Sequence, residues 1–195
     1  MPPRETGEFN SNVEVRLGVE SLYSITGVLD SAATPISHHD ALIALARCAT
    51  DFETEIIEYV RRDLLNLALG NRDNHGRNVA LLKDIDGSIR LAPLYDFGPS
   101  YLDARAIARV IRWDGEEPGA RNWSHIFHNL ATRFEEAGVP FQGWEALRLS
   151  VREFSNQLRA LPTLLTECGV RPHVIEQRGM QIERLADELA TIEEV

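Results

Sequence analysis

The sequence predicts a mainly α-helical protein with one small β-hairpin, folded as a single lobe. Apolar residues recur at helical spacing through most of the chain after residue 38. Two short β-rich runs, NVALL and SIRLAPL, flank a turn signal at Asp86-Gly87, which is typical of a hairpin. The 195 residues contain no internal repeat, low-complexity segment or second-domain boundary, so we assign residues 16–195 to one lobe.

The amino-terminal segments carry weaker patterns than the rest of the chain. Residues 1–15 are polar and irregular, which predicts a flexible lead-in. RLGVESLYSITGVL, residues 16–29, mixes β-branched and apolar residues, and we interpret it as a docking loop or short helix. SAATPIS, residues 31–37, has the composition of a linker. A helix should follow in HHDALIALARCAT, with Ser37 or Asp40 as its N-cap.

The strongest helical pattern lies just before a polar loop. Asp51 is suited to cap the start of this helix, and Gly70 is suited to end it. The apolar positions between them make a wide face, which predicts a core helix. These positions are Ile56, Ile57, Val60, Leu64, Leu65, Leu67 and Ala68.

Helices are expected again after the hairpin. SYLDARAIARVIRW, residues 100–113, is assigned as a helix, and the turn-rich DGEEPGARN separates it from another in WSHIFHNLATRFEEAG. In the next helix, GWEALRLSVREFSNQLRALPTLLTECG, Pro162 should end or kink the chain. A last helix should run from about Pro172 to the C-terminus.

Composition argues against several classes of function. The formal net charge is −10 and the cations are scattered, which argues against direct nucleic-acid binding. The acidic late segments are typical of a solvated helix face, although they could also dock a basic partner. No apolar run approaches the roughly 20 residues that span a membrane. The polar start and two widely separated cysteines lead us to expect a cytoplasmic protein.

The loop after the core helix, GNRDNHGRN, carries the residues with the clearest chemistry. Asp73 and Asn78 stand five positions apart, as Asp and Asn do in the catalytic loop of protein kinases. There the aspartate faces the acceptor hydroxyl, while the asparagine amide oxygen turns toward a magnesium ion. Beyond the hairpin, LYDFG places Asp96 in an Asp-Phe-Gly sequence, and its carboxylate suits a magnesium ion that bridges ATP phosphates.

The two motifs gain specificity from their order. An Asp-x₄-Asn pair is common by chance, and Asp-Asn-His-Gly is also ordinary turn chemistry. Here both motifs occur in the kinase order, joined by a single hairpin after a core helix. Together they predict the half of a phosphoryl-transfer site that binds magnesium and the acceptor.

This stretch resembles the HipA-type kinases of bacterial toxin–antitoxin systems. The resemblance extends from about residue 16 to about residue 131 and implies a protein-kinase-like carboxyl-terminal lobe. It is most specific in the loop and just after the hairpin. The residues that carry it there are Gly70, Asn71, Asp73, His75 and Asn78, followed by Pro93, Tyr95 and Asp96.

The resemblance implies a role for each matching residue. Asp73 would be the catalytic base, Asn71 and His75 would shape the loop, and Asn78 and Asp96 would bind Mg²⁺. Family members are described as serine/threonine protein kinases that inhibit translation by phosphorylating an aminoacyl-tRNA synthetase. A helix-turn-helix antitoxin holds them in check. The resemblance therefore implies ATP and Mg²⁺ as cofactors, a protein substrate and an antitoxin partner.

The sequence departs from a complete kinase in two respects. The family usually has lysine where this chain has Arg77, which keeps the charge but changes its geometry. A kinase also needs a glycine-rich loop and an upstream lysine to hold the ATP phosphates. The only lysine, Lys83, lies inside the predicted hairpin, and the glycines before Asp73 form no cluster. We therefore expect the ATP-clamping N-lobe to be absent from these residues.

Three interpretations remain open. In the first, the chain is half of a split kinase, and a separate N-lobe subunit completes the ATP site. In the second, it is a truncated or degenerate copy that folds without activity and acts as a protein-binding module. In the third, the kinase pattern is coincidental, and Asp73, His75 and Asp96 bind a metal ion for a hydrolase.

Overall fold

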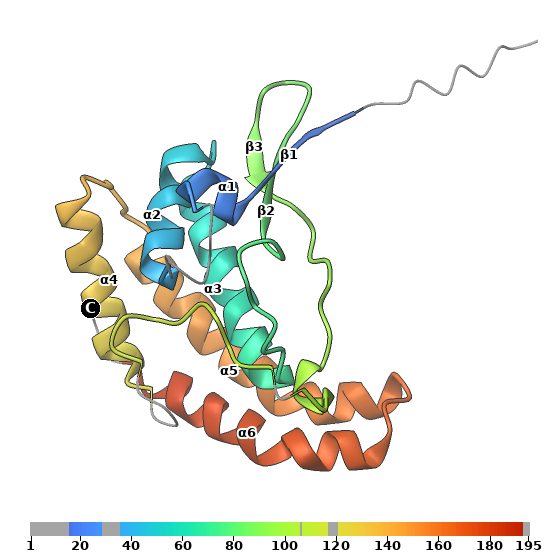
Figure 1. Ribbon diagram of the computed structural model, residues 1–195. Coiled ribbons are helices and arrows are strands. Elements are labelled where there is room, and N and C mark those ends of the chain that lie inside the picture. Colours follow the sequence, from blue (N-terminus) through green and yellow to red (C-terminus); the bar gives the residue numbers. More distant parts are fainter. Residues whose placement is uncertain (1–15, 29–35, 106, 117–120, 193–195) are drawn as a thin grey trace, which may run out of the picture.

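Six α-helices and a small sheet make up the described part of the protein (Figure 1). The computed structural model describes residues 16–28, 36–105, 107–116 and 121–192. The predicted lead-in at residues 1–15 and most of the predicted linker therefore lie outside the described residues. The helices are α1 (Leu22–Thr26), α2 (His38–Cys48), α3 (Phe52–Leu69), α4 (Trp123–Glu136), α5 (Trp144–Glu167) and α6 (Pro172–Ala190).

Helix α3 is the central element, and its ends are those the sequence predicts. Asp51 Oδ1 accepts a hydrogen bond from the Thr54 N–H at 3.3 Å at the start of the helix. Gly70 ends the helix with φ +72°, a left-handed conformation that glycine adopts without strain. The predicted apolar face is confirmed, because Ile56 and Leu64 are fully buried in the core.

The sheet has one strand more than the sequence predicts. The expected hairpin is present as β2 (Ala80–Lys83) and β3 (Ile89–Leu91), with Gly87 at φ +88° in the turn. A third strand, β1 (Gly18–Ser21), pairs antiparallel with β2 at the edge of the sheet. Its side chains are mostly exposed, so its sequence does not alternate apolar and polar residues as a half-buried strand does. Backbone pairing with β2 holds it instead.

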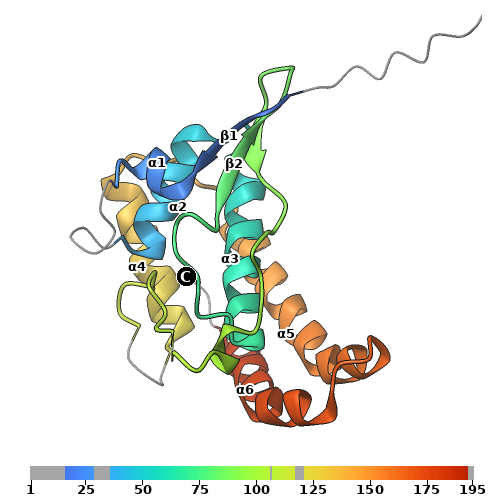
Figure 2. The same cartoon turned by 45° about the vertical axis from the view of Figure 1, so that its right-hand side comes forward.

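The remaining helices surround α3 (Figure 2). Helices α5 and α6 form a helical hairpin that packs against α3, while α4 packs against α2. The sheet lies near the amino-terminal end of α3, and α6 lies near its carboxyl-terminal end. Pro162 does not end its helix, because α5 continues through it to Glu167. The predicted start of the last helix at Pro172 is confirmed.

The predicted helix at residues 100–113 is wrong. Among the described residues of this stretch, a short 3-10 helix, η1 (Ser100–Leu102), is the only helical segment, and residues 103–105 and 107–113 are not helical. Ile111 and Trp113 are buried while Arg112 between them is exposed, which is the alternation of an extended segment. Contacts with distant parts of the chain have overridden the helical pattern of the sequence.

Candidate functional site

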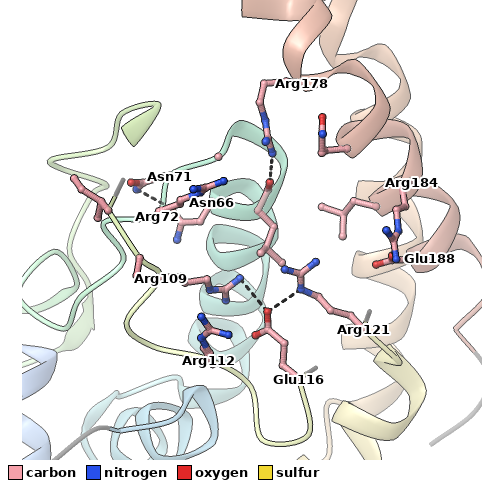
Figure 3. A pocket seen from close by; sticks show the side chains of 16 residues that line it. Asn66, Asn71, Arg72, Arg109, Arg112, Glu116, Arg121, Arg178, Arg184 and Glu188 are labelled. Carbon is pink, nitrogen blue, oxygen red and sulfur yellow. Dashed lines mark hydrogen bonds and ion pairs between the residues drawn. The ribbon is translucent and has the colours of Figure 1, made fainter. Parts of the chain in front are cut away.

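The polar loop begins at the end of α3, and the Asn71 side chain organises its first turn. Asn71 is buried, and its Nδ2 donates to Asn66 Oδ1 at 2.9 Å (Figure 3). Its Oδ1 accepts a hydrogen bond from the Asp73 backbone N–H at 3.2 Å. Asn71 therefore links the last turn of α3 to the backbone of Asp73.

Ser100 also holds this turn, from the segment that follows the Asp-Phe-Gly sequence. Its hydroxyl oxygen accepts hydrogen bonds from the backbone N–H groups of Arg72 at 2.6 Å and Asp73 at 3.1 Å. The same hydroxyl lies 3.3 Å from Asn71 Oδ1, to which it donates. Sequence reasoning did not identify Ser100. A hydroxyl residue two positions after Gly98 is the signal that could have found it.

Asp73, His75 and Asn78 lie together in the loop. Asp73 Oδ1 is 3.5 Å from His75 Nε2, and 37% of the Asp73 side chain is exposed. Asn78 Nδ2 donates to the Asp73 backbone carbonyl at 3.0 Å, and the Asn78 N–H donates to the His75 carbonyl at 2.9 Å. The amide oxygen of Asn78 is thus the side-chain atom left for a cation, and the Asp73 carboxylate reaches solvent.

Asp96 has an unusual backbone conformation on the other side of the hairpin. Its φ of +51° is in the left-handed region, which Asp tolerates better than most residues with a side chain. Its carboxylate is exposed and has no hydrogen bond or ion pair within the described residues. The neighbouring Tyr95 hydroxyl donates to the Arg77 backbone carbonyl at 2.5 Å, which ties this segment to the loop. Burial raises the pKa of Tyr95, and the charge of Asp96 raises it further.

One small cavity gathers most of the predicted site residues. It holds about 30 Å³ and is lined in part by Asn71, Asp73 and Asn78. Tyr95 and Phe97, on either side of Asp96, line the same cavity. His75 and Asp96 do not line this cavity, but their neighbours in the sequence do: Asn74 precedes His75, and Tyr95 and Phe97 flank Asp96. The structure therefore brings both motifs to one place.

Helix α1 packs against the loop at Gly76. The Tyr23 N–H donates to the Gly76 carbonyl at 3.3 Å, and the Leu22 N–H donates to the Val79 carbonyl at 2.8 Å. A Cβ atom on Gly76 would lie only 2.3 Å from Tyr23 Cδ1, so a larger residue would displace the ring or the loop. The Arg77 guanidinium lies over the same ring, 6.0 Å from its centroid. The expected short helix thus docks against the candidate site.

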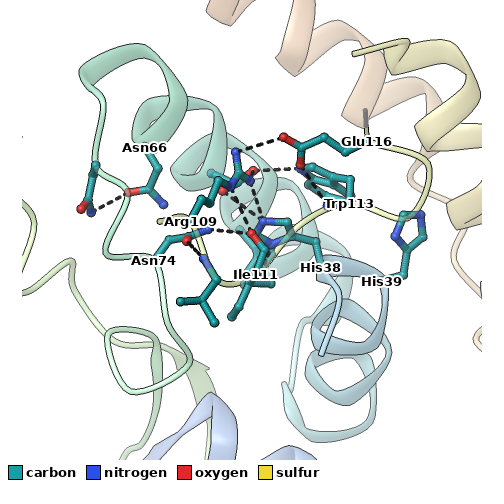
Figure 4. Close-up of polar contacts among 12 residues, drawn as sticks. His38, His39, Asn66, Asn74, Arg109, Ile111, Trp113 and Glu116 are labelled. Atoms are coloured by element: carbon teal, nitrogen blue, oxygen red, sulfur yellow. Dashed lines mark hydrogen bonds and ion pairs between the residues drawn. The ribbon is translucent and has the colours of Figure 1, made fainter. Parts of the chain in front are cut away.

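Asn74 fixes the middle of the loop to the extended segment before α4. Its Nδ2 donates to the Ile111 carbonyl at 2.9 Å, and its Oδ1 accepts from the Val110 N–H at 3.1 Å (Figure 4). The Asn74 side chain is buried, so these two bonds satisfy polar groups that water does not reach. Sequence reasoning missed this role because the partner segment was expected to be helical.

A buried carboxylate holds that extended segment in place. Asp63 Oδ2 accepts hydrogen bonds from Arg109 Nη2 at 2.7 Å and from Trp113 Nε1 at 2.8 Å. Arg109 Nε in turn donates to the Ile111 carbonyl at 3.1 Å, the same oxygen that Asn74 contacts. A continuous set of hydrogen bonds therefore runs from α3 to the middle of the loop.

Asp63 is charged despite its burial. Burial by itself would raise the pKa of this carboxyl, but the Arg109 guanidinium and His38 hold it well below its usual value of 3.8. Asp63 lies on the buried face of α3, next to Leu64. A charged residue among core positions is the signal that could have identified it from the sequence.

The metal-hydrolase interpretation finds no cluster to support it. Among the described residues, no group of three or more His, Cys, Asp or Glu side chains could hold a metal ion. Asp73, His75 and Asp96 therefore do not form the three-ligand site that this interpretation requires. In the same part of the chain, no helix has the length and apolar character needed to cross a membrane.

Comparison with known proteins identifies the fold and the family. HipA from Shewanella oneidensis MR-1, solved as a toxin–antitoxin complex with HipB and its operator DNA, has a similar fold, with a TM-score of 0.56 and 18% identity. The match covers 81% of this chain but only 38% of that HipA chain. The chain belongs to the HipA-like C-terminal domain family, whose sequence model matches residues 4–161. A comparison with curated proteins gave no match.

Replacing Asp63 tests whether its buried carboxylate stabilises the protein. Asp63→Ala leaves the Arg109 charge buried without its main partner, and we expect a loss of about 3–5 kcal/mol in the free energy of unfolding. Urea unfolding measures the difference. Asp187→Ala is the control, because it removes an exposed ion pair with Arg159 and should cost no more than about 1 kcal/mol. Similar losses in the two variants would contradict the assignment.

Proposed function

We propose that this chain is the carboxyl-terminal half of a HipA-type serine/threonine protein kinase. In this proposal Asp73 accepts the proton of the substrate hydroxyl, and Asn78 and Asp96 bind Mg²⁺. The observation that carries the proposal is the shared cavity, where Asp73 and Asn78 meet the two residues that flank Asp96. Membership of the HipA-like C-terminal domain family supports the same function.

The chemistry of Asn78 and Asp96 fits a magnesium ion. Mg²⁺ prefers oxygen ligands and is commonly held by one or two protein groups together with substrate phosphates and water. The Asn78 amide nitrogen is occupied by the Asp73 carbonyl, which leaves the amide oxygen for a cation. The Asp96 carboxylate has no competing partner within the described residues. When bound, Mg²⁺ would neutralise the charge that develops on the ATP phosphates.

The loop geometry suits Asp73 to accept a proton. Its backbone is held at the N–H by Asn71 and Ser100 and at the carbonyl by Asn78. The backbone is thus fixed while the carboxylate stays accessible to a substrate hydroxyl, which is the positioning that phosphoryl transfer requires. His75, 3.5 Å from Asp73 Oδ1, would help to orient the carboxylate.

The ATP clamp would come from outside these residues. Lys83 is exposed at the end of β2, opposite Gly18 in the sheet register, and does not line the cavity that holds Asp73. We propose that an N-lobe on a separate chain supplies the lysine and the glycine-rich loop. The alternative is a non-catalytic protein-binding module, which has the same fold but transfers no phosphoryl group. The two proposals differ in whether the chain should bind ATP with Mg²⁺.

An antitoxin is the second proposed partner. The HipA structure with a similar fold comes from a complex with HipB and operator DNA. By analogy, we propose that this chain also binds a helix-turn-helix antitoxin.

Calorimetry with ATP tests the proposed magnesium site. ATP should bind in the presence of Mg²⁺, with a Kd on the order of 1 mM, and binding should be lost with EDTA. Asp96→Ala and Asn78→Ala should each weaken it about tenfold or more, because each removes a magnesium ligand. Asp187→Ala, an exposed carboxylate on α6, should leave it unchanged. Absence of binding, or equal binding by all three variants, would favour the non-catalytic module.

Copurification tests the antitoxin. The chain would be expressed together with a helix-turn-helix antitoxin of the HipB type, with an affinity tag on that protein alone. We expect the two to elute as one complex in size-exclusion chromatography. Separate elution at micromolar concentrations would contradict the proposed partnership.

A further inference from the structure

A large cavity lies beside the candidate site and is lined by arginines (Figure 3). It has a volume of about 580 Å³ and lies between the end of α3, the extended segment before α4, and α6. Two glutamates, Glu116 and Glu188, also line it. The arginines are Arg72, Arg109, Arg112, Arg121, Arg178 and Arg184.

Two of these arginines are held rigidly by the fold. Arg178 donates to the backbone carbonyls of Leu67 at 2.6 Å and Ala68 at 2.8 Å, and it stacks 5.1 Å from the centre of the Tyr101 ring. Arg109 is fixed by the Asp63 carboxylate. Their positions therefore do not depend on a ligand, which lowers the entropy cost of binding one.

The positive charge in the cavity is only partly neutralised. Arg109 pairs with Asp63 through Nη2 at 2.7 Å, but its Nη1 is buried without a hydrogen-bond partner among the described residues and lies 3.8 Å from Glu116 Oε1. Glu116 is already used, because Arg121 Nε donates to its Oε1 at 3.0 Å and the Trp113 N–H donates to its Oε2 at 3.2 Å. Both Glu116 carboxylate oxygens therefore already accept hydrogen bonds, and Glu116 has little capacity to pair with further arginines.

Two further arginines that line the cavity carry charge that no carboxylate among the described residues pairs. Arg72 and Arg112 are exposed, and within the described residues neither guanidinium has a hydrogen bond or an ion pair. Burial lowers the pKa of Arg178, and the nearby charge of Arg72 lowers it further, against the opposing effect of Tyr101. Cations are thus crowded together in a protein whose formal net charge is −10.

This arrangement of arginines favours a phosphate group as the ligand. Guanidinium groups bind phosphate through paired, charge-assisted hydrogen bonds, and they are preferred where planar, bidentate contacts are needed. A phosphate monoester carries close to two negative charges at neutral pH and three acceptor oxygens. The cavity is concave and has the size of a site for one small ligand or side chain, unlike the long basic stripe that nucleic acids require.

We propose that this cavity binds a phosphorylated serine or threonine side chain of a protein. Asn66 and Asn71 line both this cavity and the smaller one that holds Asp73, so a bound phosphoprotein would lie directly beside the candidate catalytic loop. The proposal goes beyond phosphoryl transfer and does not rest on it, since binding requires neither Mg²⁺ nor ATP.

Titration with a phosphoserine peptide tests this inference. The probe is a short peptide with uncharged flanking residues, added in Mg²⁺-free buffer without ATP and followed by calorimetry and NMR chemical shifts. We expect binding of the phosphopeptide, no binding of its unphosphorylated form, and shifts at Arg72, Arg112 and Arg178. Arg72→Gln combined with Arg112→Gln should weaken binding about tenfold or more.

The controls test whether a loss of binding comes from misfolding, and whether the site prefers another phosphate-containing ligand. Arg90→Gln removes an exposed arginine on β3, outside the cavity, and should leave the affinity unchanged. Equal thermal unfolding of all variants would establish that they fold. Undiminished binding by the double variant would overturn the proposal. Equally tight binding of inorganic phosphate would overturn the proposal of a protein ligand and assign the site to free phosphate. Tighter binding of a DNA or RNA oligonucleotide would also overturn the proposal.

Discussion

The hydrogen bonds to the buried Asp63 carboxylate are the constraint on which the candidate site depends. Asp63 binds Arg109 and Trp113, and these two residues fix the extended segment that carries Ile111 between them. The Ile111 carbonyl then accepts from both Arg109 and Asn74. The loop is thus anchored to the core through polar groups, which specify its position more narrowly than apolar packing would.

The two sides of this network carry groups of opposite charge. On one side, the loop presents Asp73 and Asn78 to a small cavity beside Asp96. On the other, Arg109 contributes positive charge to the large arginine-lined cavity. The carboxylates of Asp73 and Asp96 thus lie at the proposed magnesium site, and guanidinium groups gather next to it. Asn66 and Asn71 line both cavities and so connect them.

Local patterns in the sequence predicted the features that local interactions determine. The ends of α3 follow from the Asp51 cap and the conformation of Gly70, and the hairpin follows from its turn. Loop residues and the two residues that flank Asp96 line one cavity, and a single hairpin joins these segments along the chain.

Features that depend on distant contacts were missed. β1 is held by backbone pairing with β2, which leaves no pattern in its side chains. Residues 100–113 have helical spacing, yet the side chains of Asn74 and Asp63 hold that segment extended. The roles of Ser100 and of the arginine-lined cavity likewise depend on residues far apart in sequence.

Paramagnetic NMR with Mn²⁺ in place of Mg²⁺ is the most direct test of the central claim, that the loop and Asp96 form one cation site. Substoichiometric Mn²⁺ would be added with ATP to the isotopically labelled protein. The account predicts line broadening centred on Asp73, Asn78 and Asp96, and its loss in Asp96→Ala. Broadening spread over the carboxylates of α6, with the loop unaffected, would contradict it.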